Sequence, residues 1–174
     1  MSQIELAAFI QTHLAVNNIN LVLSGGSAVS FYIGDRYVSK DIDLIADWPP
    51  KILELKKAMR EIGFRQKARY FVHPDTAHLV EILPGPISVG DQPITKVKSV
   101  RLSTGTLRVL TPTDTVKDRL AAYYYWADTE SLRQAVWISK SNRINIKEIT
   151  RWSEREKMTG KFMEFKKLRN QSQA

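Results

Sequence analysis

The stretch Ser24-Gly25-Gly26-Ser27 follows a short apolar run, Ile19 to Leu23, that is typical of a buried strand. Two glycines at this point let the backbone approach a ligand closely, and a helix that begins just after them offers unpaired N–H groups. This corner suits a phosphate group, although a tight turn without a ligand would have the same sequence. It is neither a Walker loop nor a dinucleotide fingerprint, because the Lys-Ser/Thr pair and the third glycine are missing.

A second decisive stretch, Asp41-Ile42-Asp43-Leu44, lies a little further along the chain. Carboxylates and apolar residues alternate from Lys40 to Ala46, and this period of two predicts a strand with both aspartates on one face. Neighbouring carboxylates repel each other unless a cation lies between them, and oxygen ligands suit Mg²⁺. A solvated edge strand is the alternative.

A third carboxylate, Glu81, is the single charged residue in the apolar run Ala77 to Leu83. An acid in such a strand is costly to bury unless it is paired or bound to a metal, although an exposed edge position would also explain it. If this strand lies beside the Asp41–Asp43 strand, the three acids face one another. Three acids beside a phosphate corner are typical of two-metal phosphoryl transfer.

These residues resemble the signature of the DNA polymerase β-like nucleotidyltransferase superfamily, in which Gly-Ser is followed by Asp-x-Asp. The strings Gly25-Gly26-Ser27-Ala28, Gly34-Asp35-Arg36 and Ser39-Lys40-Asp41-Ile42-Asp43-Leu44 are similar to those of its small bacterial members. Those members include aminoglycoside nucleotidyltransferases, minimal nucleotidyltransferases and the AbiEii-type toxins of toxin–antitoxin pairs. The signature covers roughly residues 23–45, and the expected strands extend it to about residue 110.

The resemblance implies a set of roles for these residues. Gly26 and Ser27, with Gly25 beside them, would hold the nucleotide phosphates. Asp41 and Asp43 would bind Mg²⁺, in a two-metal site in which Mn²⁺ is an alternative. Glu81 would share the metal site and assist the acceptor hydroxyl, although the third acid of the family is often Asp.

Further cations are candidates for contacts with the triphosphate. Arg36 and Lys40 flank the acids, and Arg36 is preferred because Lys40 would point away from Asp41 in a strand. Lys117 is chosen from the charged run Lys117-Asp118-Arg119, which lies early in the helix that Pro112 opens. Surface charge or an ordinary amphipathic helix would also explain these residues. A basic run, Arg65, Lys67 and Arg69, would share one face of a strand and suit an RNA backbone or plain solvent.

The composition narrows the class of protein. The chain has 174 residues, 43% of them hydrophobic and 25% charged, which suits a globular fold and excludes a disordered chain. The absence of cysteine excludes disulfides, thiolate metal sites and a cysteine nucleophile. Neither a secretory leader nor a long apolar run is visible, so we expect a cytoplasmic protein without membrane contact. A net charge of +8, concentrated in residues 143–174, favours a polyanionic partner.

The order of the predicted elements indicates an α+β fold. We expect a nucleotidyltransferase-type mixed sheet flanked by helices in residues 1–110, followed by a helical segment in residues 111–174 that packs on this core. Strands are predicted at Phe64 to Val72 and, as a hairpin, around Thr104-Gly105. From Val116 the apolar spacing predicts one helix as far as Ser141-Asn142, and two further helical stripes follow.

The sequence therefore predicts a Mg²⁺-dependent nucleotidyltransferase that moves a nucleoside monophosphate from an NTP, for example ATP, to an acceptor hydroxyl. The basic charge favours an RNA acceptor such as a tRNA end, and with it a toxin-like role and an antitoxin partner. A small-molecule acceptor of the aminoglycoside type, or a protein acceptor, is the alternative. A non-catalytic nucleotide-binding or RNA-binding module on the same fold is the second class of function that stays open.

Overall fold

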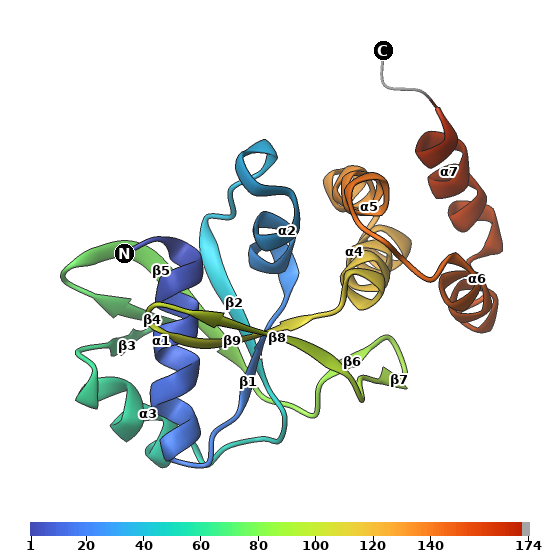
Figure 1. Ribbon diagram of the computed structural model, residues 1–174. Coiled ribbons are helices and arrows are strands. Elements are labelled where there is room, and N and C mark those ends of the chain that lie inside the picture. Colours follow the sequence, from blue (N-terminus) through green and yellow to red (C-terminus); the bar gives the residue numbers. More distant parts are fainter. Residues whose placement is uncertain (172–174) are drawn as a thin grey trace.

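A seven-stranded mixed sheet forms the centre of the computed structural model, which describes residues 1–171 (Figure 1). Its strand order is β3-β4-β5-β2-β1-β9-β8, and a separate hairpin is formed by β6 and β7. The strands are β1 (Leu21–Leu23), β2 (Asp41–Ala46), β3 (Arg65–Lys67), β4 (Tyr70–His73), β5 (Thr76–Leu83), β6 (Ser88–Val89), β7 (Gln92–Pro93), β8 (Val97–Leu102) and β9 (Gly105–Leu110). The helices are α1 (Gln3–Val16), α2 (Gly25–Ile33), the 3-10 turn η1 (Gly34–Arg36), α3 (Ile52–Glu61), α4 (Pro112–Trp126), α5 (Thr129–Ser141), α6 (Ile146–Arg155) and α7 (Thr159–Asn170).

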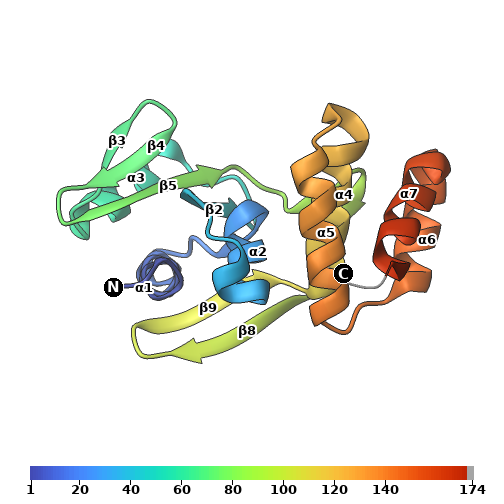
Figure 2. The same ribbon diagram turned by 90° about the horizontal axis from the view of Figure 1, so that it is seen from above.

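The predicted period of two in β2 decides which face of the sheet is buried. Ile42, Leu44 and Ala46 are fully buried against the core that α1 and α3 cover, and Asp41 and Asp43 point to the opposite face. Figure 2 shows α1 lying between the two ends of the curved sheet. On the opposite face, Val22, Ile87 and Leu110 pack together. At this cluster the segment that contains β6 and β7 covers the sheet. The acids therefore lie on the face of the sheet that the helices α1 and α3 leave uncovered.

The helices after residue 111 have a hydrophobic core of their own. Trp152, Phe162 and Phe165 pack there with α4 and α5, and Val29 of α2 and Val89 of β6 join the same cluster. In Figures 1 and 2 these four helices lie to one side of the sheet, with α4 and α5 nearer to it than α6 and α7. Residues 172–174, the end of the predicted helical segment, lie outside the described residues. Within residues 1–171, no helix is both long and apolar enough to span a membrane.

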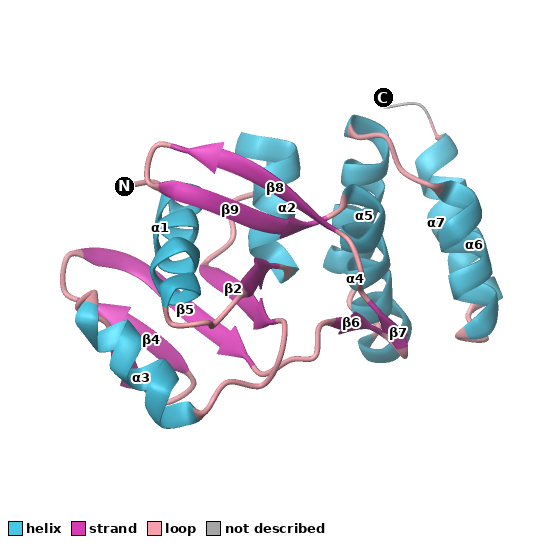
Figure 3. Cartoon of the chain, turned by 60° about the horizontal axis from the view of Figure 1, so that its bottom comes forward, coloured by secondary structure: helices cyan, strands magenta, loops and turns pink. Residues whose placement is uncertain are grey.

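The predicted architecture is confirmed: a mixed sheet flanked by helices precedes a helical segment (Figure 3). Two local predictions were wrong, and one element was missed. The strand predicted from Phe64 to Val72 is a hairpin, because Ala68 adopts a positive φ of 53° and turns the chain between β3 and β4. The long helix predicted from Val116 is broken by Ala127, which is left-handed, and by Asp128, whose side chain caps α5. The short hairpin of β6 and β7 was not predicted.

Candidate active site

Parallel pairing of β2 with β5 brings the three predicted acids together. Asp43 lies directly opposite Glu81 in the register, and Asp41 lies one pleat away on the same face. Ligand oxygens from Asp41, Asp43 and Glu81 all lie within 4.8 Å of one another. We call these three residues the acidic cluster. The sequence predicted that the three acids would face one another if their strands were neighbours. The two strands are neighbours, and the three acids do lie together.

Asp43 is the most strongly perturbed member of the acidic cluster. Burial, and then the neighbouring Asp41 carboxylate, raise the pKa of Asp43 to about 6, with Glu81 acting in the same direction. Asp43 lies beside two other carboxylates, and a positive charge close by would favour its ionised form. The acidic cluster is therefore suited to hold a cation.

The glycine turn is built around Asp43. The Gly26 amide donates a hydrogen bond to Asp43 Oδ2 at 3.1 Å. Gly25 has a φ of +54°, and a Cβ at this residue would lie 2.3 Å from the same oxygen. A side chain there would be strained and would displace the carboxylate. The two glycines thus permit the close approach that the sequence predicted, and the partner in this structure is Asp43 itself.

Ser27 stabilises this turn from inside the core. Its side chain is fully buried, and its hydroxyl donates to the Ser24 carbonyl oxygen at 2.9 Å and accepts from the Asp43 amide at 3.0 Å. The Ser24 amide in turn donates to the Asp43 carbonyl oxygen at 2.9 Å. The resemblance assigned the Ser27 hydroxyl to the nucleotide phosphates. In this structure the hydroxyl forms hydrogen bonds that connect α2 with β2.

Arg119 of α4 supplies a positive charge on the other side of the acidic cluster. Burial lowers the pKa of Arg119, but Asp118 and Asp43 more than offset this effect and hold it above its usual value. The guanidinium donates to Asp118 Oδ2 through Nε at 2.9 Å and Nη2 at 2.5 Å. The charge of Arg119 also acts on Asp43, where it lowers the pKa and so opposes the effect of burial. Sequence analysis had included Arg119 in the charged run but had selected Lys117.

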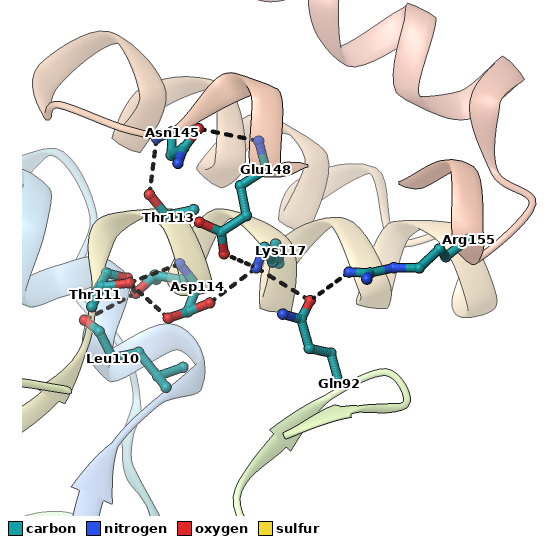
Figure 4. Close-up of polar contacts among 10 residues, drawn as sticks. Gln92, Leu110, Thr111, Thr113, Asp114, Lys117, Asn145, Glu148 and Arg155 are labelled. Carbon is teal, nitrogen blue, oxygen red and sulfur yellow. Dashed lines mark hydrogen bonds and ion pairs between the residues drawn. The ribbon is translucent and has the colours of Figure 1, made fainter. Parts of the chain in front are cut away.

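Lys117, which was selected from the sequence as a contact of the triphosphate, is instead held by Asp114, Glu148 and Gln92 (Figure 4). Its side chain is 1% exposed, and its ammonium contacts Glu148 Oε1 at 2.5 Å, Asp114 Oδ1 at 3.3 Å and Gln92 Oε1 at 3.4 Å. Residues 117 and 119 are two positions apart, and two positions correspond to about 200° around a helix. Once Arg119 faces the sheet, Lys117 must point toward α6 and β7. We call Lys117, Asp114 and Glu148 the Lys117 network.

The two other predicted phosphate contacts, Arg36 and Lys40, come from the segment between α2 and β2. The Arg36 guanidinium lies over the ring of Trp137 on α5, 5.6 Å from its centroid, and Arg36 follows the end of α2 opposite to the glycine turn. Lys40 is exposed just before β2. Both stay predictions as contacts of the triphosphate.

Arg69 contacts the acidic cluster from the outer strands. Its Nε lies 3.7 Å from Glu81 Oε1, its Nη2 donates to the Tyr70 hydroxyl at 2.5 Å, and its guanidinium lies over the Tyr70 ring. Arg69 is in this place because the chain turns at Ala68, which the sequence did not predict. The sequence therefore did not predict that Arg69 pairs with Glu81, because this pairing depends on the hairpin of β3 and β4.

The donor set of the acidic cluster fits a divalent metal ion. All three ligands are carboxylates, which suit hard cations such as Mg²⁺ or Mn²⁺. Burial raises the pKa of Asp43 most, and the negative charge of Asp41 and Glu81 adds to this effect. Asp41, Asp43 and Glu81 could therefore hold such an ion.

Comparisons with known proteins identify solved structures that share the fold. No protein-family model matches the chain, and no curated protein matches its sequence significantly. An antigenic nucleotidyltransferase-like protein from Paracoccidioides brasiliensis has a similar structure, with a TM-score of 0.59 and 12% identity over 78% of this chain and 75% of that one. ANT(2")-Ia, solved in complex with adenylyl-2"-tobramycin, gives a TM-score of 0.55 and 18% identity over 94% of this chain and 98% of its own.

At these identities the similarity concerns the fold. The chain has the nucleotidyltransferase fold, as the sequence predicted. The similarity does not single out the toxin subgroup that the sequence resembles. The acidic cluster lies on the sheet of this fold beside the glycine turn.

Proposed function

We propose that this protein is a nucleotidyltransferase that moves a nucleoside monophosphate from an NTP to an acceptor hydroxyl. The observation that carries the proposal is the approach of three carboxylates to within 4.8 Å on one sheet face, beside a glycine turn and opposite Arg119. Residues 1–110 would supply the acids and the turn, and the helical segment from residue 111 would supply the facing cation. Such a reaction depends mainly on positioning and charge neutralisation.

In the proposed reaction, Asp41, Asp43 and Glu81 would hold Mg²⁺, and this ion would supply charge that neutralises the phosphate oxygens. Arg119 faces the same space, and its fixed cation suits the oxygens of the triphosphate. Glu81 accepts the proton of the acceptor hydroxyl. The acceptor oxygen then forms a bond to the α-phosphorus, the bond from that phosphorus to the leaving oxygen breaks, and pyrophosphate departs.

The acceptor is the second part of the proposal. An RNA end accounts for the net charge of +8, and it would place the reaction in the cytoplasm, with a toxin-like role and an antitoxin partner. The fold shared with ANT(2")-Ia supports a small-molecule acceptor as the competing candidate, since that protein was solved with an adenylylated aminoglycoside. A non-catalytic module would keep the fold without turnover.

The test is transfer of label from each of four α-labelled NTPs, with Mg²⁺, to RNA, protein or tobramycin. We expect Asp43→Asn to lower transfer at least about a thousandfold, which corresponds to about 4 kcal/mol of transition-state stabilisation. Asp75→Asn is the matched control, because the side chain of Asp75 is 88% exposed in the turn before β5. Transfer that survives in Asp43→Asn would contradict the proposed role of the acidic cluster.

A further inference from the structure

A row of polar side chains crosses four strands and ends at the acidic cluster. Lys67 of β3 pairs with Tyr70 of β4, Tyr70 pairs with Glu81 of β5, and Glu81 pairs with Asp43 of β2. Paired residues on neighbouring strands share a face of the sheet. The row therefore leads across the uncovered face from the outer edge to the acids.

The next row confirms this assignment of faces. Phe71 pairs with Val80, and Val80 pairs with Ile42, and these three side chains are at most 3% exposed. They pack in the core that α3 covers with Leu55 and Met59. Because neighbouring rows alternate between the two faces, Lys67 and Tyr70 lie on the face opposite to α3.

The outer part of the row is basic and exposed. Arg65 lies on the same face as Lys67, two residues away, and every residue of β3 is exposed. The side chain of Arg69 is 68% exposed, lies over the Tyr70 ring and reaches Glu81. We call Arg65, Lys67, Arg69 and Tyr70 the basic row. Lys67 is three strand spacings from Asp43, a distance of about 14 Å.

We propose that the basic row is the docking surface for the acceptor strand of a single-stranded RNA, whose terminal hydroxyl reaches the acidic cluster. Arg65 and Lys67 contact phosphates a few nucleotides before that hydroxyl, and the Tyr70 ring under Arg69 offers a surface for base stacking. This inference rests on the proposed function, because that function makes the terminal hydroxyl of the RNA the acceptor. Binding of RNA to the basic row does not itself require turnover.

Charge complementarity favours RNA over a polycationic acceptor. Lysine and arginine neutralise phosphates and release counterions, which is the main source of affinity for nucleic acid. A polycation such as an aminoglycoside would meet three exposed positive charges on the same approach to Glu81. The basic row would repel it while attracting a phosphate backbone.

The experiment measures binding of a fluorescein-labelled short single-stranded RNA with a free 3′ hydroxyl by fluorescence anisotropy, without NTP. The variant is Arg65→Ala/Lys67→Ala, and the matched control is Lys57→Ala/Arg60→Ala, which removes the same charge from exposed residues of α3 on the opposite side of the sheet. We expect the row variant to bind RNA about tenfold more weakly. Its log–log salt slope should fall by about 1.4, or about 0.7 for each lost phosphate contact. The α3 control should bind as the wild type does.

Other readouts separate this inference from the proposed function. NTP affinity, measured by calorimetry, and thermal unfolding should be unchanged in the row variant, because β3 is an exposed edge strand. Equal weakening in both double variants, or absence of RNA binding by the wild type, would each overturn the basic row as an RNA surface. RNA binding that depends on the row in a protein without transfer activity would support the docking surface and refute the proposed function alone.

Discussion

Two groups of charged residues lie on either side of α4, and they differ in how their charge is balanced. In the Lys117 network, one buried ammonium contacts two carboxylates and an amide oxygen, so the cation has its partners within the chain. In the acidic cluster, three carboxylates meet one another, Arg69 lies 3.7 Å from Glu81, and the charge of Arg119 acts on Asp43. The same residue types thus stabilise the fold on one side of the helix and leave a demand for positive charge on the other.

This difference in charge balance separates a structural group of charges from one that indicates a bound ligand. A buried ion pair with complete hydrogen bonding is mainly a structural feature, and removing one partner is costly because the other stays buried without compensation. A cluster of like charges destabilises the protein that carries it, so its presence indicates a ligand of opposite charge. Substitution of Arg119 should therefore mainly lower activity, and substitution of Lys117 on the other face of α4 should mainly lower the free energy of unfolding.

Of the two faces of α4, the one that carries Arg119 should have the larger effect on transfer, tested by Arg119→Met. Loss of this cation should lower nucleotidyl transfer about a hundredfold, equivalent to about 2.7 kcal/mol, because a charged group that faces the reacting phosphates is lost. The free energy of unfolding should fall by about 1 kcal/mol or less, since Asp118 keeps access to water. Labelled transfer and urea denaturation on the same preparation measure both quantities.

Lys117→Met is the matched control on the other face of α4. It should lower the free energy of unfolding by about 2 kcal/mol, because Asp114 is left without its buried partner, while Glu148 is partly solvated. Transfer per folded molecule should stay at the wild-type level. If Lys117→Met abolished transfer without loss of stability, the assignment of the two faces would be reversed.

A smaller effect is expected where the glycine turn supports Asp43. Gly25→Ala places a Cβ 2.3 Å from Asp43 Oδ2 at a φ of +54°, so transfer should fall about tenfold as the carboxylate moves. Gly34→Ala is the control, because Gly34 has a φ of +59° with no atom within 4 Å of the added Cβ. Both should lose about 1 to 3 kcal/mol of stability, because a residue with a Cβ rarely adopts a positive φ. Equal transfer by both variants would argue against the close contact with Asp43.

The smallest effect is a pH dependence of stability in the metal-free protein. The pKa of Asp43 is raised to about 6 by burial and by Asp41, whereas an unfolded aspartate titrates at about 3.9. Between these values the folded state binds more protons, so the free energy of unfolding contributed by this group falls as pH rises. Asp43→Asn removes this loss, and its stability relative to the wild type should therefore increase by about 1 to 2 kcal/mol between about pH 4 and pH 7.

Urea denaturation in EDTA at several pH values tests this dependence. Added Mg²⁺ should restore stability to the wild type at neutral pH and should have less effect on Asp43→Asn, since a ligand that binds the folded state stabilises it. A stability difference that did not change with pH would show that Asp43 is not the perturbed group.

Several parts of the site could be predicted because they depend on short-range spacing. The alternation in Asp41-Ile42-Asp43-Leu44 predicted two acids on one face, and Ser24-Gly25-Gly26-Ser27 predicted a strand, a turn and a helix start. The Thr104-Gly105 hairpin was predicted from the same kind of signal. The hairpin at Ala68 and the break at Ala127 were not, because a left-handed alanine has no marker in the sequence.

The sequence by itself determined which residues share a face within one strand and where the glycine turn lies, since the pleat and the turn depend only on neighbouring residues. Tertiary structure alone decided that Glu81 pairs with Asp43, that Arg119 rather than Lys117 faces the sheet, and that Lys67 and Tyr70 continue the row of Glu81. These relations depend on strand order, register and the rotation of α4. Packing between distant segments sets all three, and no local pattern encodes it.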